Sequence, residues 1–399
     1  MIAMIAAIAA IAALVAAAPA EPEPAVRLEP ALLPEVQLEP ALLPAEGAKG
    51  ALALRDGSVL AVRTEPHEGG MAVVCFRSTD GGRSWSRMGI IARANEPDAD
   101  IGDGCFLELR DGTLLHAYRD NRLHGRHAAA PTYAIRVAAS TDGGRTWRPH
   151  STVEESRPVG PGPSRGLWSS FLIETRSGAL QCYYDDEYTP NAEGFRGHQW
   201  LRMRTWDPRD RAWVRPVTVS RAHRPEHLSR DGMATVIEVA RGHLLCVFES
   251  VQTFAPHANV VRWVESRDGG RSWSWERTER GVVYEPRDRR FMALAPWVAR
   301  MPSGALICVF VTDEDRATPD RSGTPPPYLN MDAKLVVSRD GGRTWSAPVT
   351  FYAETHRAYM PGIVPLKEPG PGEAFLALVL DTRAGFRGRR GRLEAPRRR

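Results

Sequence analysis

The feature that most constrains the fold of this chain is an eight-residue segment that occurs four times. The copies read STDGGRSW, STDGGRTW, SRDGGRSW and SRDGGRTW, and they begin at Ser78, Ser140, Ser266 and Ser338. A catalytic group is needed once per active site, so four copies indicate a structural role. Repetition along the whole chain predicts a fold that is built from repeated units.

A longer unit surrounds these segments and occurs six times. Each copy is an apolar run, a Gly-containing turn and a second apolar run, which is a strong signal for a β-hairpin. The copies span residues 51–63, 105–119, 171–184, 234–248, 297–311 and 363–380. After each of the first five hairpins comes another short strand and then the eight-residue segment or, at Thr205–Trp213, a degenerate copy. Four strands per unit predict an all-β fold, a six-bladed β-propeller over residues 48–382.

The residue types of the eight-residue segment suit a tight turn. Its Gly pair permits positive φ, its Asp carboxylate accepts backbone N–H groups within the turn, and its Trp buries a large ring between strands. We therefore assign structural roles to Asp80, Trp85, Asp142, Trp147, Asp268, Trp273, Asp340 and Trp345.

Both ends of the chain lie outside the predicted propeller. Residues 1–20 are apolar, Ala-rich and end in Ala18-Pro19-Ala20, as a signal peptide does, although no Lys or Arg precedes the apolar run. We expect a secreted or extracytoplasmic protein with no stable membrane anchor. Residues 21–47 predict a Pro-rich linker, and the Arg-rich residues 383–399 predict a disordered tail. The sixth blade would then have to borrow a strand, most simply from residues 36–50, or stay incomplete.

Composition and motifs exclude several functions. The sequence contains no P-loop, no GxGxxG that opens a helix and no CxxC or Cys/His cluster, so we expect no cofactor and no metal. The Arg cluster of the tail is weak evidence for a nucleic-acid partner, so we expect none. Cys182, Cys246 and Cys308 occupy strand positions that suit buried thiols. We expect a monomer.

Polar residues should gather where the hairpin strands begin and end, because both points lie at one mouth of the central channel. Seven residues after each turn Gly stand Thr64, Arg119, Asp185, Glu249 and Val311, and just past them stand Asp120, Asp186, Glu187, Asp313, Glu314 and Asp381. The residues that enter the first strands are Asp100, Asp103, Arg165, Trp168, Arg230, Asp231 and Tyr359.

Such a set of carboxylates, Arg side chains and aromatic rings is typical of a glycosidase. These enzymes use one carboxylic acid to protonate the leaving oxygen and a second carboxylate as nucleophile or base. The candidate catalytic residues are Glu249, Glu187, Asp186 and Asp100. The candidate substrate-binding residues are Arg119, Asp120, Arg165, Trp168, Arg230 and Tyr359. The expected partner is a carbohydrate substrate.

The repeated segments resemble the Asp boxes of the sialidase superfamily. Within it, DIGDGCFLELRDGTLLHAYRDN (100–121), CYYDDE (182–187) and RDGMATVIEVARGHLLCVFE (230–249) resemble glycoside hydrolase family 93, the exo-arabinanases. That resemblance implies a six-bladed, retaining enzyme that releases arabinobiose from linear α-1,5-arabinan, with Glu249 as general acid/base. The family's nucleophile lies in a Trp-Glu-Pro stretch, whereas this chain has Ser169 and Ser170 after Trp168. Either Asp186 or Glu187 has taken that role, the enzyme inverts, or hydrolysis is lost.

Two other functions stay open. An exo-sialidase would need three Arg around a substrate carboxylate, for which Arg165, Arg230 and Arg290 are available, and Tyr359 with Glu249 as nucleophile pair. The segment GAKGALAL lacks the Arg that sialidases carry at the start of the first blade. A non-catalytic propeller that binds glycans or proteins is the alternative from a different class.

Overall fold

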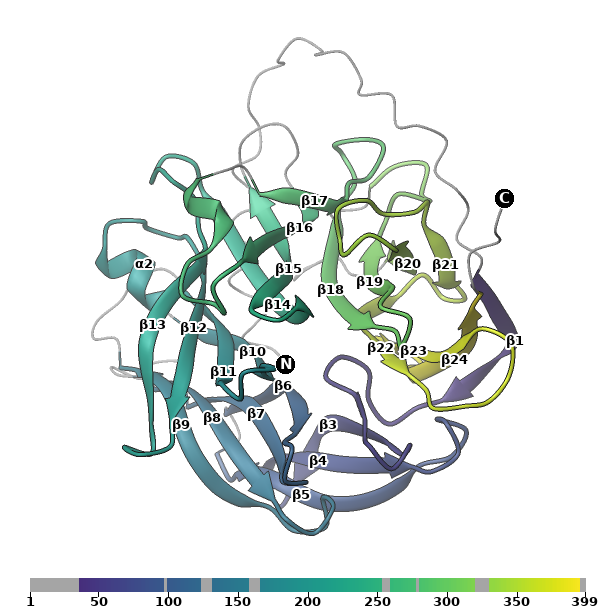
Figure 1. Ribbon diagram of the computed structural model, residues 1–399, viewed down its shortest axis with the longest axis horizontal. Helices are drawn as coiled ribbons and strands as arrows, with labels where there is room; N and C mark the ends of the chain where they lie inside the picture. Colours follow the sequence, from purple (N-terminus) through teal and green to yellow (C-terminus); the bar gives the residue numbers. More distant parts are fainter. Residues whose placement is uncertain are drawn as a thin grey trace.

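The computed structural model describes residues 36–96, 99–122, 131–157, 166–252, 259–277, 280–319 and 330–394. Its strands form six four-stranded sheets that surround a central axis (Figure 1). This arrangement confirms the predicted all-β, six-bladed propeller. No helix in the described ranges is long and apolar enough to cross a membrane.

Five of the blades are continuous in sequence, and within each the strands lie in chain order. Blade 1 consists of β2 (Leu52–Ala53), β3 (Val59–His67), β4 (Gly70–Ser78) and β5 (Ser86–Ala94). Blade 2 consists of β6 (Asp100–Glu108), β7 (Leu114–Asn121), β8 (Tyr133–Ser140) and β9 (Arg148–Ser156). Blade 3 consists of β10 (Leu167–Glu174), β11 (Leu180–Asp186), β12 (Trp200–Asp207) and β13 (Ala212–Ser220), with the short helix α2 (Tyr188–Ala192) after β11.

Blade 4 consists of β14 (Ser229–Ala240), β15 (His243–Gln252), β16 (Asn259–Ser266) and β17 (Gly281–Tyr284), with a 3₁₀ turn at Ser274–Glu276. Blade 5 consists of β18 (Ala293–Arg300), β19 (Leu306–Thr312), β20 (Asp332–Ser338) and β21 (Val349–Tyr352). The first strand of each blade is the innermost. Second strands such as β11 and β19 are buried at every position, because neighbouring blades cover both of their faces.

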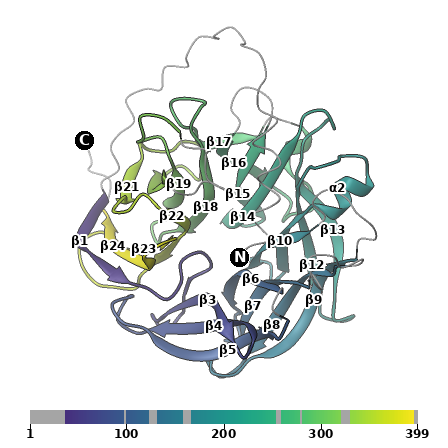
Figure 2. The same ribbon diagram turned by 180° about the vertical axis from the view of Figure 1, so that it is seen from behind.

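The sixth blade joins the two ends of the chain. It contains β22 (Ala358–Pro365), β23 (Glu373–Asp381), β24 (Gly385–Leu393) and, outermost, β1 (Val36–Pro44), which pairs antiparallel with β24. Both views show β1 beside β24 (Figures 1 and 2). The prediction of a borrowed N-terminal strand was right, whereas the predicted linker at 21–47 and disordered tail at 383–399 were wrong for residues 36–44 and 385–393.

The ion pairs of β24 explain why residues 385–393 form a strand. Arg390 is buried, with an ion pair to Glu39 at 3.2 Å and another to Glu368, and Arg389 pairs with Glu354 at 3.3 Å. Carboxylates from the rest of the blade therefore compensate the Arg-rich strand. The predicted leader 1–20 lies outside the described residues.

The four repeated segments have the same internal hydrogen bonds. In each, the Asp carboxylate accepts the backbone N–H groups three and four residues later, at 2.9–3.1 Å, as Asp340 does from Arg343 and Thr344. Both glycines have positive φ in all four, for example 78° at Gly341 and 94° at Gly342. The Trp rings pack into the clusters between blades. These segments connect strands 3 and 4 of a blade and lie away from the axis.

Candidate active site at the channel mouth

The innermost strands share an irregularity that shapes the channel. Five of them, β6, β10, β14, β18 and β22, carry a register shift near their first residues. In four of these bulges a non-Gly residue has positive φ: Asp103 (51°), Met233 (55°), Ala295 (52°) and Met360 (43°). Bulges redirect side chains and backbone groups, and strained residues concentrate at functional sites. The bulges form a ring of unusual backbone around the axis.

Two carboxyl groups reach these bulges from the neighbouring blade. Asp185, at the end of β11, accepts the N–H of Met233 at 3.1 Å, and Glu249, on β15, accepts the N–H of Ala295 at 2.8 Å. Burial raises the pKa of Asp185 well above its usual value, although Lys49 and the Met233 N–H oppose it and Glu249 adds to it. Burial also raises the pKa of Glu249, and the Ala295 N–H and the Lys49 charge oppose this rise.

A charged cluster lies beside this pair. Asp103 forms an ion pair with Lys49 at 3.0 Å and with Arg119 at 2.7 Å, and Arg119 also binds Asp100 at 2.7 Å. The Ser169 hydroxyl donates to Asp103 at 2.9 Å. Burial alone would raise the pKa of Asp103, but Lys49 and Arg119 hold it at about 2. Asp103 is therefore ionised at neutral pH.

Glu187 and Arg230 form a second buried pair. Glu187 contacts the Arg230 guanidinium and accepts the Gly166 N–H at 3.1 Å, while Arg230 also donates to Gln199 at 3.0 Å. Arg230 influences the ionisation of Glu249 electrostatically, so this pair faces the same site. Glu187 is fully engaged, and this contact suits a structural anchor for Arg230.

Two predicted site residues face away from the channel. Asp186 accepts the N–H groups of Tyr188 and Thr189 at 2.8 and 2.9 Å, so it caps the start of α2. Asp120 binds Arg136 at 2.7 Å on the outer part of its blade. Asp186 follows Asp185, and Asp120 follows Arg119. Because successive strand residues point to opposite faces, Asp186 and Asp120 face the other way. Their predicted catalytic and substrate-binding roles have no support in these contacts.

The remaining predicted residues have distinct positions. Trp168 is half-buried, with the Arg119 guanidinium 5.9 Å from its ring centre. Tyr359 is buried on β22 and interacts electrostatically with Arg119. Arg165 lies outside the described residues. Arg290, the further Arg considered for a sialidase, pairs with Asp288 at 2.7 Å and is largely exposed.

Three residues of the site were missing from the predicted sets. The strand positions of Asp185 and Asp103 place both residues at the mouth but assign them no role. Lys49 lies in GAKGALAL, the segment that lacks the Arg of sialidases. The signal for Asp185 was its distance of seven residues from the turn Gly, the same as for Glu249. No local pattern distinguishes Lys49, because its role depends on packing between blades.

An aromatic contact joins two inner strands that belong to blades that are not neighbours. Phe171 on β10 and Trp297 on β18 meet edge to face with ring centres 5.4 Å apart. Blades 3 and 5 are not neighbours, so this contact crosses the axis. The inner strands of blades 3 and 5 therefore pack on one another through apolar side chains.

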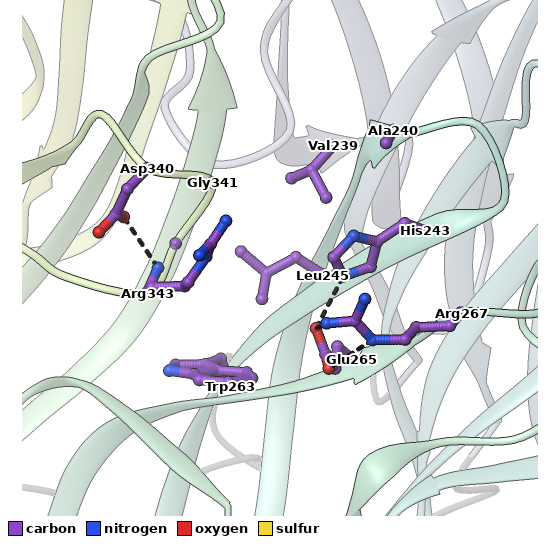
Figure 3. Close-up of a pocket in the computed structure, with 11 residues that line it drawn as sticks. Val239, Ala240, His243, Leu245, Trp263, Glu265, Arg267, Asp340, Gly341 and Arg343 are labelled. Carbon is purple, nitrogen blue, oxygen red and sulfur yellow. Dashed lines mark hydrogen bonds and ion pairs between the residues drawn. The ribbon is translucent and has the colours of Figure 1, made fainter.

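A separate groove lies between blades 4 and 5, at the opposite end of β15 from Glu249 (Figure 3). It has a volume of about 440 Å³ and is lined by Trp263, His243, Arg343 and their neighbours. It shares no residue with the channel cluster. In the described ranges no three His, Cys, Asp or Glu residues lie together in a way that could hold a metal ion.

Comparisons with known proteins agree with the fold. Residues 336–347 match the BNR/Asp-box repeat family. The α-L-arabinofuranosidase of Fusarium graminearum, solved with an iminosugar inhibitor, is 17% identical with a TM-score of 0.61, covering 92% of this chain and 99% of that one. The Penicillium chrysogenum α-L-arabinanase with arabinobiose is 18% identical with a TM-score of 0.61, covering 91% and 98%.

A sialidase also resembles this chain in structure. The Hadza microbial sialidase is 17% identical with a TM-score of 0.55, covering 88% of this chain and 66% of that one. No curated protein matches the sequence. The predicted Asp-box repeat is confirmed by the family match, and the predicted propeller fold is confirmed by these structural similarities.

Proposed function

We propose that this chain is an exo-acting glycoside hydrolase that removes a neutral terminal sugar unit from a glycan. The observation that carries the proposal is the pair Asp185 and Glu249, which occupy equivalent positions in blades 3 and 4 and both have raised pKa values. Hydrolysis of a glycoside needs one protonated and one ionised carboxyl group. Two carboxyl groups that interact can share one proton over a range of pH.

The exposure of the two groups suggests their roles. Glu249 is half-buried and can reach substrate, so it donates its proton to the leaving oxygen as the glycosidic C–O bond breaks. Asp185 is 2% exposed and, in its ionised form, accepts a proton from the attacking water. Asp103 stays ionised and stabilises the positive charge that develops on the sugar ring. Trp168 offers a ring face for the sugar.

The charges at the mouth favour a neutral sugar. Within the described part of the chain, each cation of the cluster already has a carboxylate partner: Lys49 binds Asp103, Arg119 binds Asp100 and Asp103, and Arg230 binds Glu187. An acidic sugar would have to compete with these ion pairs. Similarity to the folds of an arabinofuranosidase and an arabinanase supports an arabinan-type substrate.

A propeller that binds glycans without hydrolysing them is the second candidate. The observation in its favour is Ser169, whose hydroxyl binds Lys49 and Asp103 where family 93 enzymes carry their nucleophile. Binding would then use the same mouth, and no bond would be cleaved.

A glycan screen tests the proposal. Purified protein is incubated with linear arabino-oligosaccharides and, separately, with an aryl sialoside, and the released sugars are identified by chromatography. We expect short units from the ends of the arabino-oligosaccharides and no release from the sialoside. Sialic acid release would exclude the neutral-substrate proposal, and binding of oligosaccharide without any product would establish the second candidate.

A further inference from the structure

Lys49 reaches the channel on a backbone segment that joins three blades. The innermost strand of blade 1, β2, has only two residues. The residues before it bridge the neighbouring blades: the Lys49 N–H donates to Met360 O of blade 6 at 3.1 Å, and Gly50 O accepts the Phe106 N–H of blade 2 at 3.3 Å. The segment therefore fills the place that a longer inner strand would occupy.

Close backbone packing fixes this segment. A Cβ added to Gly50 would lie 2.1 Å from the carbonyl oxygen of Gly104 in blade 2, and Gly50 has a φ of 84°. A Cβ added to Gly362 in blade 6 would lie 2.3 Å from the carbonyl oxygen of Ala48. Glycine is required where backbones approach so closely. Lys49 thus starts from a rigid main chain.

The ammonium group of Lys49 is equally constrained. It lies 3.0 Å from Asp103 Oδ1 and 3.1 Å from the Ser169 hydroxyl, and Lys49 is only 8% exposed. Ser169 in turn donates to the other oxygen of Asp103 at 2.9 Å. A buried charge needs such partners, because their loss leaves an uncompensated ion. The three side chains form a closed triangle on the channel wall.

We propose that Lys49 is the positioning residue of the channel, which holds Asp103 in place and supplies the positive charge that acts on Asp185 and Glu249. The proposal rests on the proposed function. In support, Lys49 lowers the pKa of each of these three carboxyl groups. The other charged or titratable groups around the triangle and the pair are Asp100, Cys105, Arg119, Glu187, Arg230, Cys246 and Tyr359.

The pH dependence of hydrolysis separates this role from a structural one. Without the positive charge, Asp185 and Glu249 should hold protons to higher pH, so both limbs of the kcat/KM profile should move up by roughly 1 pH unit in Lys49→Gln. Lys49→Arg keeps the charge and should keep the wild-type limbs. Lower activity with unmoved limbs in Lys49→Gln would overturn the proposal.

Lys334→Met is the matched control. Lys334 is a second buried, ion-paired lysine, 2.7 Å from Glu314 and 2.8 Å from Asp315 in blade 5. Its removal should cost stability and leave both limbs where they are. Limbs that move equally in Lys334→Met and Lys49→Gln would show a general loss of packing and overturn the proposal.

A measurement without substrate keeps the test independent of the proposed function. Carboxyl ¹³C resonances of Asp185 and Glu249 are titrated by NMR in the wild type and in Lys49→Gln and Lys49→Arg. We expect higher midpoints for both groups in Lys49→Gln and wild-type midpoints in Lys49→Arg. Unchanged midpoints in Lys49→Gln would refute the role of Lys49, whereas shifted midpoints in a protein that hydrolyses no glycan would refute only the proposed function.

Discussion

Adjacent residues at the end of β11 have opposite environments. Asp185 faces the channel and the bulge at Met233, whereas Asp186 caps α2 through Tyr188 and Thr189. The alternation of a strand explains the difference. The one-residue step decides which side chain can take part in catalysis.

This step gives a paired prediction. Asp185→Asn should abolish hydrolysis, because it removes the base and the shared proton. Asp186→Ala should keep the wild-type kcat and lower the free energy of unfolding by about 1 kcal/mol, as the loss of a helix cap does. Steady-state kinetics and urea denaturation measure the two effects. Equal loss of kcat in both variants would contradict the assignment.

The raised pKa values of Asp185 and Glu249 set the pH dependence of the wild type. Activity needs one proton on the pair, so it should fall at low pH, when both groups are protonated, and at high pH, when both are ionised. Because burial raises both values, the acid limb of kcat/KM should lie above the usual range of Asp and Glu. An acid limb at or below pH 4 would contradict the burial of the pair.

At the scale of elements, the sequence predicted the hairpins and their channel ends well. A fixed count from the turn Gly brings Asp185 and Glu249 to equivalent points, because each pairs with the inner strand of its blade just past the bulge of that strand. The count fails one residue further along the strand, as Asp186 and Asp120 show, because that side chain points to the other face. It also cannot foresee the bulges, since the positive φ of Asp103 depends on packing around the axis.

The turn segments make a prediction about stability. Asp340 accepts hydrogen bonds from Ser338, Arg343 and twice from Thr344. Asp340→Ala leaves these donors without their charged acceptor, so the free energy of unfolding should fall by about 1–3 kcal/mol with kcat unchanged. Asp210→Ala, in the degenerate copy, is the control and should have little effect. A loss of kcat without loss of stability would contradict a purely structural role.

The closure of the six-bladed propeller depends on β1, which completes the sixth blade. Leu38 and Leu42 of β1 pack against the main core cluster, and the strand covers the edge of β24. The sequence predicted the borrowed strand because the last hairpin left blade 6 short. It did not predict β24, because an Arg-rich segment with no acidic residues beside it in the sequence is typical of a disordered tail. The carboxylates that pair with this strand, Glu39, Glu354 and Glu368, come from distant positions in the sequence.

Truncation tests this closure. A chain that begins at residue 45 loses β1 and exposes the edge of β24, so it should have a lower melting temperature and associate with itself. A chain that begins at residue 36 keeps β1 and serves as the control. Calorimetry and light scattering measure the two properties. Equal melting temperatures for both chains would show that β1 does not close the ring.

The most direct test of the account is the turnover of Glu249→Gln on the best neutral oligosaccharide of the screen. Glutamine keeps the shape of Glu249 and an oxygen for the Ala295 N–H but has no proton to give. We predict a loss of kcat of roughly 10²–10⁴-fold with oligosaccharide binding retained, and no loss for Glu265→Gln, which lies away from the channel. A Glu249→Gln variant that turns over substrate at the wild-type rate would contradict the account.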